Sequence, residues 1–476
     1  MTSFDSVGLD NSITVAVGPP GRPVHDDAQT GRTDRSAVAY WRRTEGLLDV
    51  ADDLAAFDPA EPDRAWYAGA ADVALLVAMA LGVRCPPWRT HVRDVGRIPP
   101  AATGWFSSEG VVIRADTSHV DNLASRPMHV STDRLTETAA VAAHLADLIR
   151  GLPDWHAPGG AMVAHGGGAG SALLLKHRPP AAEGGPITVT GWSGEVVVPG
   201  RGRWPVEELA AELPKLWPLL WRRHLPAALS VVAAAHAGVG VVITGHDLRR
   251  LLSASPAELA MMKPGRWSGE PTFSGRRRHP AYRHAVGDGA GPPLTEPGPW
   301  GWLTPEGADQ VGALREASDI AWFRWAAHAG QACRDLLAVW ADPGLAWTME
   351  TARRLGVQVT IPAWRPDILA AVWDLPLSLR ATVEHGLIRN GPLLGSPESR
   401  ERAVGGEQRC RTTAAAWAAS PAGAVALDRL TKGYLVDAKM VDGTMIRNAI
   451  ENSFIRTNHA LTLHRLTVVD SWLGGR

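Results

Sequence analysis

The chain has 476 residues, a formal net charge of −1, 45% apolar residues and 20% charged residues. This length predicts two domains of unequal size, and the composition is that of a globular protein with a large core. The near-neutral charge argues against nucleic acid or a membrane surface as a partner, and no apolar run is long enough to span a bilayer. The N-terminal residues are polar and acidic, so we expect no signal peptide and a cytoplasmic protein.

The N-terminal part of the sequence predicts a small unit of strands and helices. A β-branched run at residues 13–17 predicts one strand in an otherwise loose segment. Leucine and alanine at helical spacing predict two helices within residues 47–82. Residues 104–116 alternate apolar and polar side chains, including Val111 and Ile113, which predicts an edge hairpin.

From residue 131 onward, apolar strands alternate with helices. Residues 131–150 predict a helix that ends at Gly151. Residues 161–164 predict a short buried strand, a glycine run follows, and residues 171–176 predict the start of a helix. Residues 239–244 predict a second buried strand. This alternation is typical of an α/β fold, with a parallel sheet and flanking helices.

The second half of the sequence has one irregular stretch. Residues 263–312 are rich in glycine, proline and arginine and predict a long excursion, after which the pattern is mostly helical. His279 and His284 lie in this basic stretch, which is either a solvated loop or a contact for peptide or phosphate. No group of Cys, His, Asp or Glu has metal-ligand spacing, so no metal ligands are predicted.

Three motifs follow one another in an informative order. The glycine-rich turn at residues 165–171 follows a strand and opens a helix, so it presents backbone N–H groups to an anion. This turn resembles the Ser-Gly-Gly-x-Asp-Ser pyrophosphate loop of the asparagine synthetase family. Residues 240–252 resemble that family's second motif, an apolar strand ending in Gly-x-Gly-x-Asp-Glu. Residues 356–365 are similar to its Pro-(aromatic)-Leu-Asp segment.

Two further stretches, residues 75–100 and 430–450, are similar to the lasso peptide cyclases (macrolactam synthetases) of this family. The resemblance implies an asparagine-synthetase or ATP-pyrophosphatase-like domain at residues 119–476. It also implies a truncated, glutaminase-like α+β remnant at residues 1–118. Thr2 stands where glutaminase domains carry a nucleophilic cysteine, so the amine is expected to come from a peptide.

The resemblance implies ATP as a ligand and places phosphate-binding residues in the first two motifs. These are Gly166, Gly167, Gly168, Ser171, Arg249 and Arg250. The positions at which the family has acidic residues for Mg²⁺ carry Ala169, Arg249, Arg250 and Arg365 instead, and Val404 replaces an expected lysine. Since two like charges at contact distance repel by about 4 kcal/mol at a surface-like dielectric, this exchange argues against Mg²⁺ there. The arginines either contact phosphate directly or form ordinary surface salt bridges.

Two functions follow from these observations. One is an ATP-dependent ligase that adenylates a carboxylate and forms an amide (macrolactam) on a peptide. The other is a catalytically inactive pseudoenzyme that binds a precursor peptide, or pairs with an active homologue, in the biosynthesis of a ribosomally made peptide natural product (RiPP). Retained apolar architecture with lost polar groups is the pattern expected when folding is kept and catalysis is lost, which slightly favours the pseudoenzyme. The sequence identifies no catalytic residue.

Overall fold

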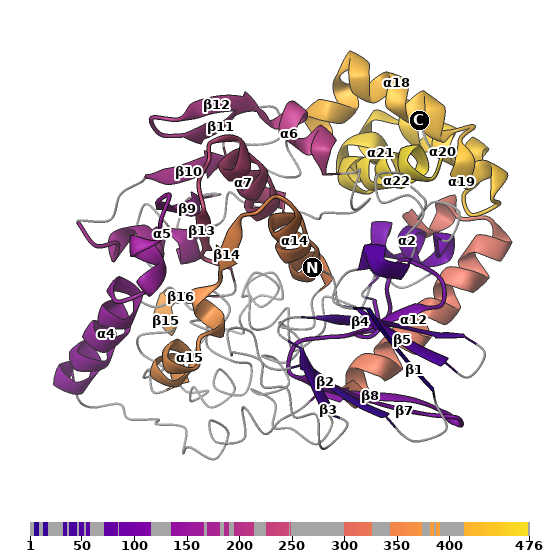
Figure 1. Ribbon diagram of the computed structural model, residues 1–476. Helices are drawn as coiled ribbons and strands as arrows, with labels where there is room; N and C mark the ends of the chain where they lie inside the picture. Colours follow the sequence, from indigo (N-terminus) through magenta and orange to yellow (C-terminus); the bar gives the residue numbers. More distant parts are fainter. Residues whose placement is uncertain are drawn as a thin grey trace.

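The largest sheet of the described residues has six strands and is mixed but mostly parallel (Figure 1). The computed structural model of the chain describes residues 4–8, 13–17, 32–35, 38–44, 47–51, 54–57, 71–83, 85–115, 135–165, 169–180, 185–189, 195–213, 225–246, 248, 299–325, 343–373, 381–384, 387–390 and 414–474. In spatial order the central strands are β12 (Gly202–Pro205), β11 (Glu195–Val198), β10 (Pro186–Val189), β9 (Ala161–His165), β13 (Val241–Thr244) and β14 (Gln358–Thr360). The last four are parallel, whereas β11 and β12 add an antiparallel edge. The predicted α/β class is therefore confirmed, with a mixed rather than an all-parallel sheet.

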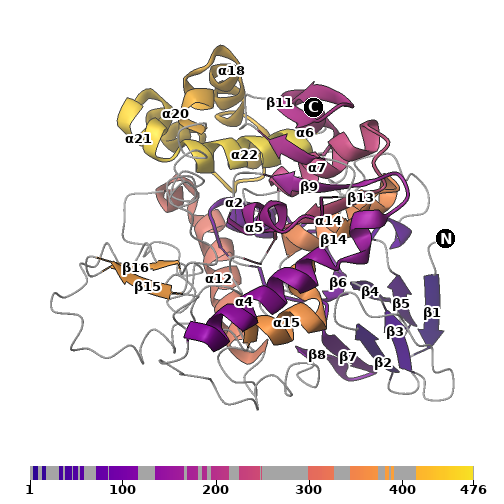
Figure 2. The ribbon, with the colours of Figure 1, turned by 90° about the vertical axis from the view of Figure 1, so that its left-hand side faces the viewer.

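Both faces of this sheet are covered, which is why its inner strands are apolar throughout. In β9, Met162 and Ala164 belong to the core on one face, and Ala161 and Val163 to the core on the other. The first face packs against α7 (Leu225–His236) and α14 (Pro343–Arg354). The second face packs against α4 (Leu135–Arg150), α5 (Ala169–Lys176) and α15 (Pro366–Trp373), and Figure 2 shows α4 beside α15.

Two four-stranded sheets form a sandwich in the N-terminal part. One has the order β1 (Phe4–Gly8), β5 (Leu47–Ala51), β4 (Ala39–Thr44) and β6 (Val95–Ile98). The other has the order β3 (Arg32–Arg35), β2 (Ile13–Val17), β7 (Ala102–Ser107) and β8 (Gly110–Ala115). Leu48 and Val50 of the first sheet share a core with Val15 and Phe106 of the second, as expected for two sheets packed face to face.

The structure confirms some of the N-terminal predictions and corrects one. The strand at residues 13–17 is β2, and the hairpin at residues 104–116 is formed by β7 and β8. The first of the two helices predicted within residues 47–82 is wrong. Its residues form β5, which pairs on both sides with β1 and β4, followed by one 3₁₀ turn, η1 (Leu54–Phe57). The second predicted helix is confirmed as α2 (Val73–Ala80).

The predicted irregular excursion is too long at its C-terminal end. Helix α12 (Pro305–Trp325) begins inside it, and the Thr304 hydroxyl accepts a hydrogen bond from Gly307 N at 3.0 Å, which caps the first turn. A short 3₁₀ turn, η4 (Pro299–Trp302), precedes it. The earlier part of the excursion, with His279 and His284, lies outside the described residues.

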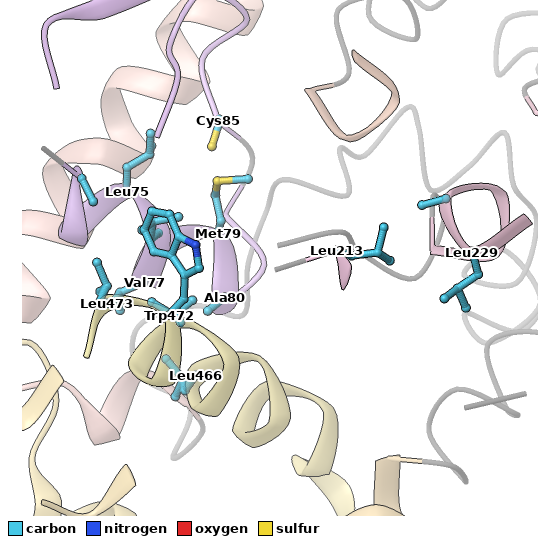
Figure 3. Packing of buried hydrophobic residues seen from close by; sticks show 14 of the residues in the cluster. Leu75, Val77, Met79, Ala80, Cys85, Leu213, Leu229, Leu466, Trp472 and Leu473 are labelled. Atoms are coloured by element: carbon cyan, nitrogen blue, oxygen red, sulfur yellow. The ribbon is translucent and has the colours of Figure 1, made fainter. Parts of the chain in front are cut away.

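The C-terminal part is helical, as predicted, apart from β14 and the hairpin of β15 (Ala381–Glu384) and β16 (Leu387–Asn390). Its last helices are α18 (Pro421–Leu430), α19 (Tyr434–Asp437), α20 (Gly443–Glu451), α21 (Ser453–Asn458) and α22 (Ala460–Leu473). Helix α2 is apolar on all sides because it is enclosed, and Figure 3 shows Leu466 and Trp472 of α22 packed close to it. Within the described residues, no helix has both the length and the apolar character to cross a membrane.

Candidate functional site

The central sheet changes direction between β9 and β13. After β9 the chain continues to β10 on one side, and it later returns to place β13 on the other side of β9. In open α/β sheets, ligands bind outside the carboxyl ends of the strands at such a switch point. The strands of the first two motifs, which the resemblance predicts to bind phosphate, are β9 and β13, and their carboxyl ends lie at this switch point.

The first turn of α5 is in direct backbone contact with the turn that follows β13. A Cβ atom added to Gly170 would lie 2.2 Å from the Gly245 carbonyl oxygen. One added to Gly245 would lie 2.2 Å from Ser171 N and 2.3 Å from the Gly170 carbonyl carbon. Only glycine at both positions allows the first turn of α5 to touch the turn after β13.

Ser171 and His165 form a polar pair beside this contact. The His165 Nδ1 atom lies 2.9 Å from the Ser171 Oγ atom, and which of the two donates depends on the imidazole tautomer. Ser171 is 6% exposed and lies in the first turn of α5, while His165 is the last residue of β9. A helix N-terminus and a hydroxyl in this position can donate hydrogen bonds to an anion.

The structure describes only part of the predicted phosphate site. Ser171 is in the first turn of the helix, as predicted, and Leu248 of the second motif is fully buried behind it. The remaining predicted phosphate-binding residues lie outside the described residues: Gly166, Gly167, Gly168, Arg249 and Arg250. Their roles stay predictions.

Arg365 of the third motif is engaged in an ion pair. Its Nη2 atom lies 2.8 Å from Asp367 Oδ2, and its Nε donates to Asp367 Oδ1 at 3.1 Å. This hydrogen bond holds the pKa of Arg365 above its usual value and the pKa of Asp367 below its usual value. The negative charge of Asp154 also raises the pKa of Arg365, by less, and Asp154 Oδ1 accepts a hydrogen bond from Thr360 Oγ1 at 2.7 Å. Of the two readings of Arg365, the geometry favours a salt bridge.

Two of the positions at which the asparagine synthetase family has acidic residues are described, and their side chains do not fit Mg²⁺. Ala169 begins α5 with a methyl side chain, and Arg365 presents a guanidinium, so neither supplies an oxygen ligand. Across the described ranges, no group of three or more His, Cys, Asp and Glu side chains is arranged to hold a metal ion. Val404, which stands where the family has a lysine, is not among the described residues, and Lys432, which follows α18, pairs with Asp428 at 2.8 Å on the surface.

A cavity that the sequence did not predict lies between the N-terminal sandwich and α12. Its volume is about 700 Å³, and its described lining is Trp41, Trp88, Val111, Val112, Ile113, Arg114, Arg324 and Trp325. Its three tryptophans are far apart along the chain. No local motif therefore pointed to this cavity.

Comparisons with known proteins add no family assignment. Neither a scan against protein-family models nor a search of curated proteins found a match for this chain.

Proposed function

We propose that the chain is an asparagine-synthetase-like protein that holds nucleotide phosphates between the carboxyl ends of β9 and β13. The carrying observation is the backbone contact of the first turn of α5 with Gly245 at the switch point of the sheet. The strand order β10-β9-β13-β14 and the helices on both faces support an ATP-pyrophosphatase-like fold for this region. The ancestral reaction would be adenylation of a carboxylate by ATP, followed by amide formation on a peptide.

The Ser171–His165 pair gives this site a simple way to bind phosphate. When Nδ1 of His165 carries the proton, it donates to Ser171 Oγ and turns the hydroxyl hydrogen away from the imidazole. That hydrogen then adds to the N–H groups of the first turn of α5 as a donor toward phosphate oxygens. No step of this binding depends on Mg²⁺.

A pseudoenzyme is the second candidate, and the state of Arg365 favours it. The asparagine synthetase family has a carboxylate at this position, and its chemistry needs it. In this chain the position holds Arg365, which forms an ion pair with Asp367 at 2.8 Å. The same chain would then retain the fold, bind a peptide or nucleotide, and act as a partner of an active homologue. Catalysis by this chain itself would be lost.

Calorimetric titration with ATP, in Mg²⁺ and again in EDTA, tests the phosphate site. We expect binding in both buffers, and about threefold to tenfold weaker binding for Ser171→Ala, since one hydrogen bond to the ligand is lost. Ser318→Ala is the matched control, because Ser318 is a buried serine of α12. Absence of binding in both buffers would refute the phosphate site, and binding only with Mg²⁺ would show that the acidic positions have been misassigned.

An assay of pyrophosphate release, which accompanies adenylation of the carboxylate before the amide forms and AMP leaves, separates the two candidates when run with ATP in the presence and absence of a peptide. ATP binding without pyrophosphate release supports the pseudoenzyme. Release that depends on a peptide supports the ligase.

A further inference from the structure

The tryptophan-lined cavity runs along an unpaired sheet edge. Strand β8 is the last strand of its sheet and pairs only with β7 in the part of the chain that the structure describes. Four consecutive residues of β8, from Val111 to Arg114, line the cavity. Because successive side chains of a strand point to opposite faces, a wall of four consecutive residues places the cavity at the strand's edge.

The backbone of β8 offers hydrogen bonds to this cavity. In an antiparallel pair, every second residue turns its N–H and C=O groups away from the partner strand. An edge of this kind is a ready template for another strand. The volume of about 700 Å³ is in the range of ligand sites, so the edge has space in front of it.

Two tryptophans of the cavity wall have indole nitrogens that are themselves buried. Trp325 is 2% exposed, and neither its Nε1 nor that of Trp41 has a hydrogen-bond partner in the described structure. These two residues therefore offer apolar ring surface to the cavity, against which apolar side chains of a ligand can pack.

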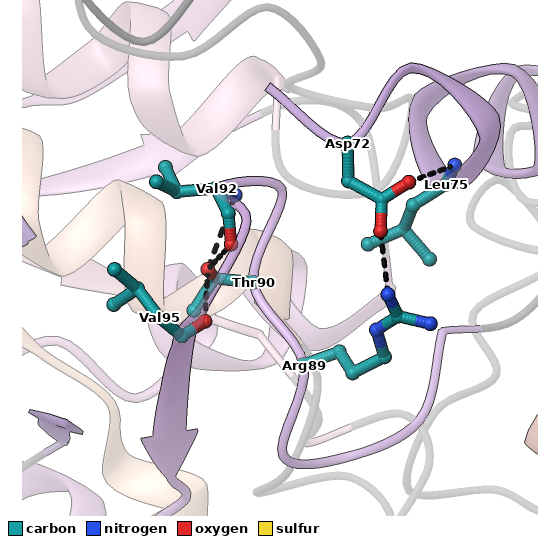
Figure 4. A network of polar contacts seen from close by, with 6 residues as sticks. All are labelled: Asp72, Leu75, Arg89, Thr90, Val92 and Val95. Atoms are coloured by element: carbon teal, nitrogen blue, oxygen red, sulfur yellow. Dashed lines mark hydrogen bonds and ion pairs between the residues drawn. The ribbon is translucent and has the colours of Figure 1, made fainter. Parts of the chain in front are cut away.

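The aromatic wall is held in place before any ligand arrives. Gly96 lies directly opposite Trp41 in the sheet, and an added Cβ there would lie 2.3 Å from the indole ring, so glycine makes room for that ring. Trp88 lies 6.3 Å from Trp325, centroid to centroid. The loop that carries Trp88 is fixed by Arg89, whose Nη2 lies 2.5 Å from Asp72 Oδ2 (Figure 4).

The charged residues in the described lining of the cavity are both arginines. Arg114 and Arg324 are exposed, and neither forms an ion pair with a described acid. A ligand with carboxylate groups would therefore match the cavity, and a basic one would not.

We propose that the β8 edge receives an extended, acidic peptide segment as an additional strand, with its apolar side chains against Trp41, Trp88 and Trp325. Main-chain hydrogen bonds to an edge strand, with pockets for alternate side chains, are an established mode of peptide recognition. The inference rests on the proposed peptide substrate or partner, and not on nucleotide binding. It assigns that peptide a docking surface separate from the β9–β13 crevice.

Fluorescence anisotropy with a labelled peptide tests this docking. The probe has six residues, the length of β8, with valine and threonine alternating and two glutamates at its C-terminal end. The second probe is the same peptide with alternate backbone amides N-methylated, which removes the donors needed for strand pairing. We expect saturable binding of the first probe to the full chain without nucleotide, and binding of the second weaker by about tenfold or more.

Charge-reversal variants provide the matched comparison. Arg114→Glu and Arg324→Glu should each weaken binding of the first probe by about threefold to tenfold, whereas Arg447→Glu, an exposed arginine of α20, should not change it. Equal binding of the two probes, or no binding of the first, would overturn the proposal. The anisotropy experiment contains no nucleotide, so a negative result for the peptide would not contradict the proposed phosphate site, which the ATP titration tests.

Discussion

Replacing Gly245 by alanine should separate the first turn of α5 from the turn after β13, which together form the described part of the candidate site. The new Cβ would lie 2.2 Å from Ser171 N and 2.3 Å from the Gly170 carbonyl carbon, whereas non-bonded carbon contacts are comfortable at about 3.5–4.0 Å. Both obstructing atoms belong to the backbone, so no side chain can move aside. The start of α5 or the turn after β13 must shift by about an ångström or more. We expect this overpacking to cost about 1–3 kcal/mol locally.

Hydrogen exchange followed by mass spectrometry reports this loss where it occurs. A cost of that size should lower the protection of amides in α5 and β9 by about 5-fold to 150-fold. Gly312→Ala is the control, because no atom lies within 4 Å of its added Cβ and it replaces glycine inside helix α12. The control should raise α12 protection by about fourfold and leave α5 unchanged. Protection of α5 in Gly245→Ala within about twofold of wild type would refute the packing argument.

Three further outcomes are expected. Burial lowers the pKa of His91 to about 3, so below about pH 6.5 the unfolded chain binds a proton that the folded chain does not, and stability falls as the pH falls toward 3. Between about pH 6.5 and pH 5, the free energy of unfolding measured in urea should therefore fall less steeply for His91→Gln than for wild type, by up to about 1.4 kcal/mol per pH unit. Parallel plots of that free energy against pH for the two proteins would contradict this. Arg365→Ala should leave the calorimetric affinity for ATP within about twofold of wild type, since Asp367 already occupies the guanidinium, and a larger loss would favour direct phosphate contact. Asp442 caps α20 by accepting from Thr444 N at 2.8 Å, so Asp442→Ala should lower the free energy of unfolding by about 1 kcal/mol, whereas Asp442→Asn should retain most of it.

The parts of the fold that the sequence predicted are those with local causes. Strands β9 and β13 are buried on both faces, so their residues are apolar in an unbroken run that periodicity analysis detects. The sequence predicts a helix where β5 forms, because Leu47 and Leu54 are spaced as on one face of a helix. Its conformation depends on pairing with β1 and β4, which lie elsewhere in the sequence.

The candidate site divides in the same way. The glycine turn and Ser171 were visible in the sequence because the strand, turn and helix are consecutive. The contact of Gly170 with Gly245 joins two turns that are distant in the chain, so only the tertiary structure reveals it. The ion pair of Arg365 with Asp367 is local, but a sequence does not tell a paired arginine from a phosphate ligand.

The enclosure of α2 has a consequence for the order in which the chain folds. This helix lies near the N-terminus, yet it packs against α22, which ends at Leu473. Trp322 of α12 also donates to the Cys85 carbonyl oxygen at 2.7 Å, just after α2. During synthesis the part of the apolar surface of α2 that α22 covers must therefore stay exposed until α22 has been made. Contacts between residues so far apart in the sequence slow folding, and apolar surface that stays exposed during that time is prone to aggregation.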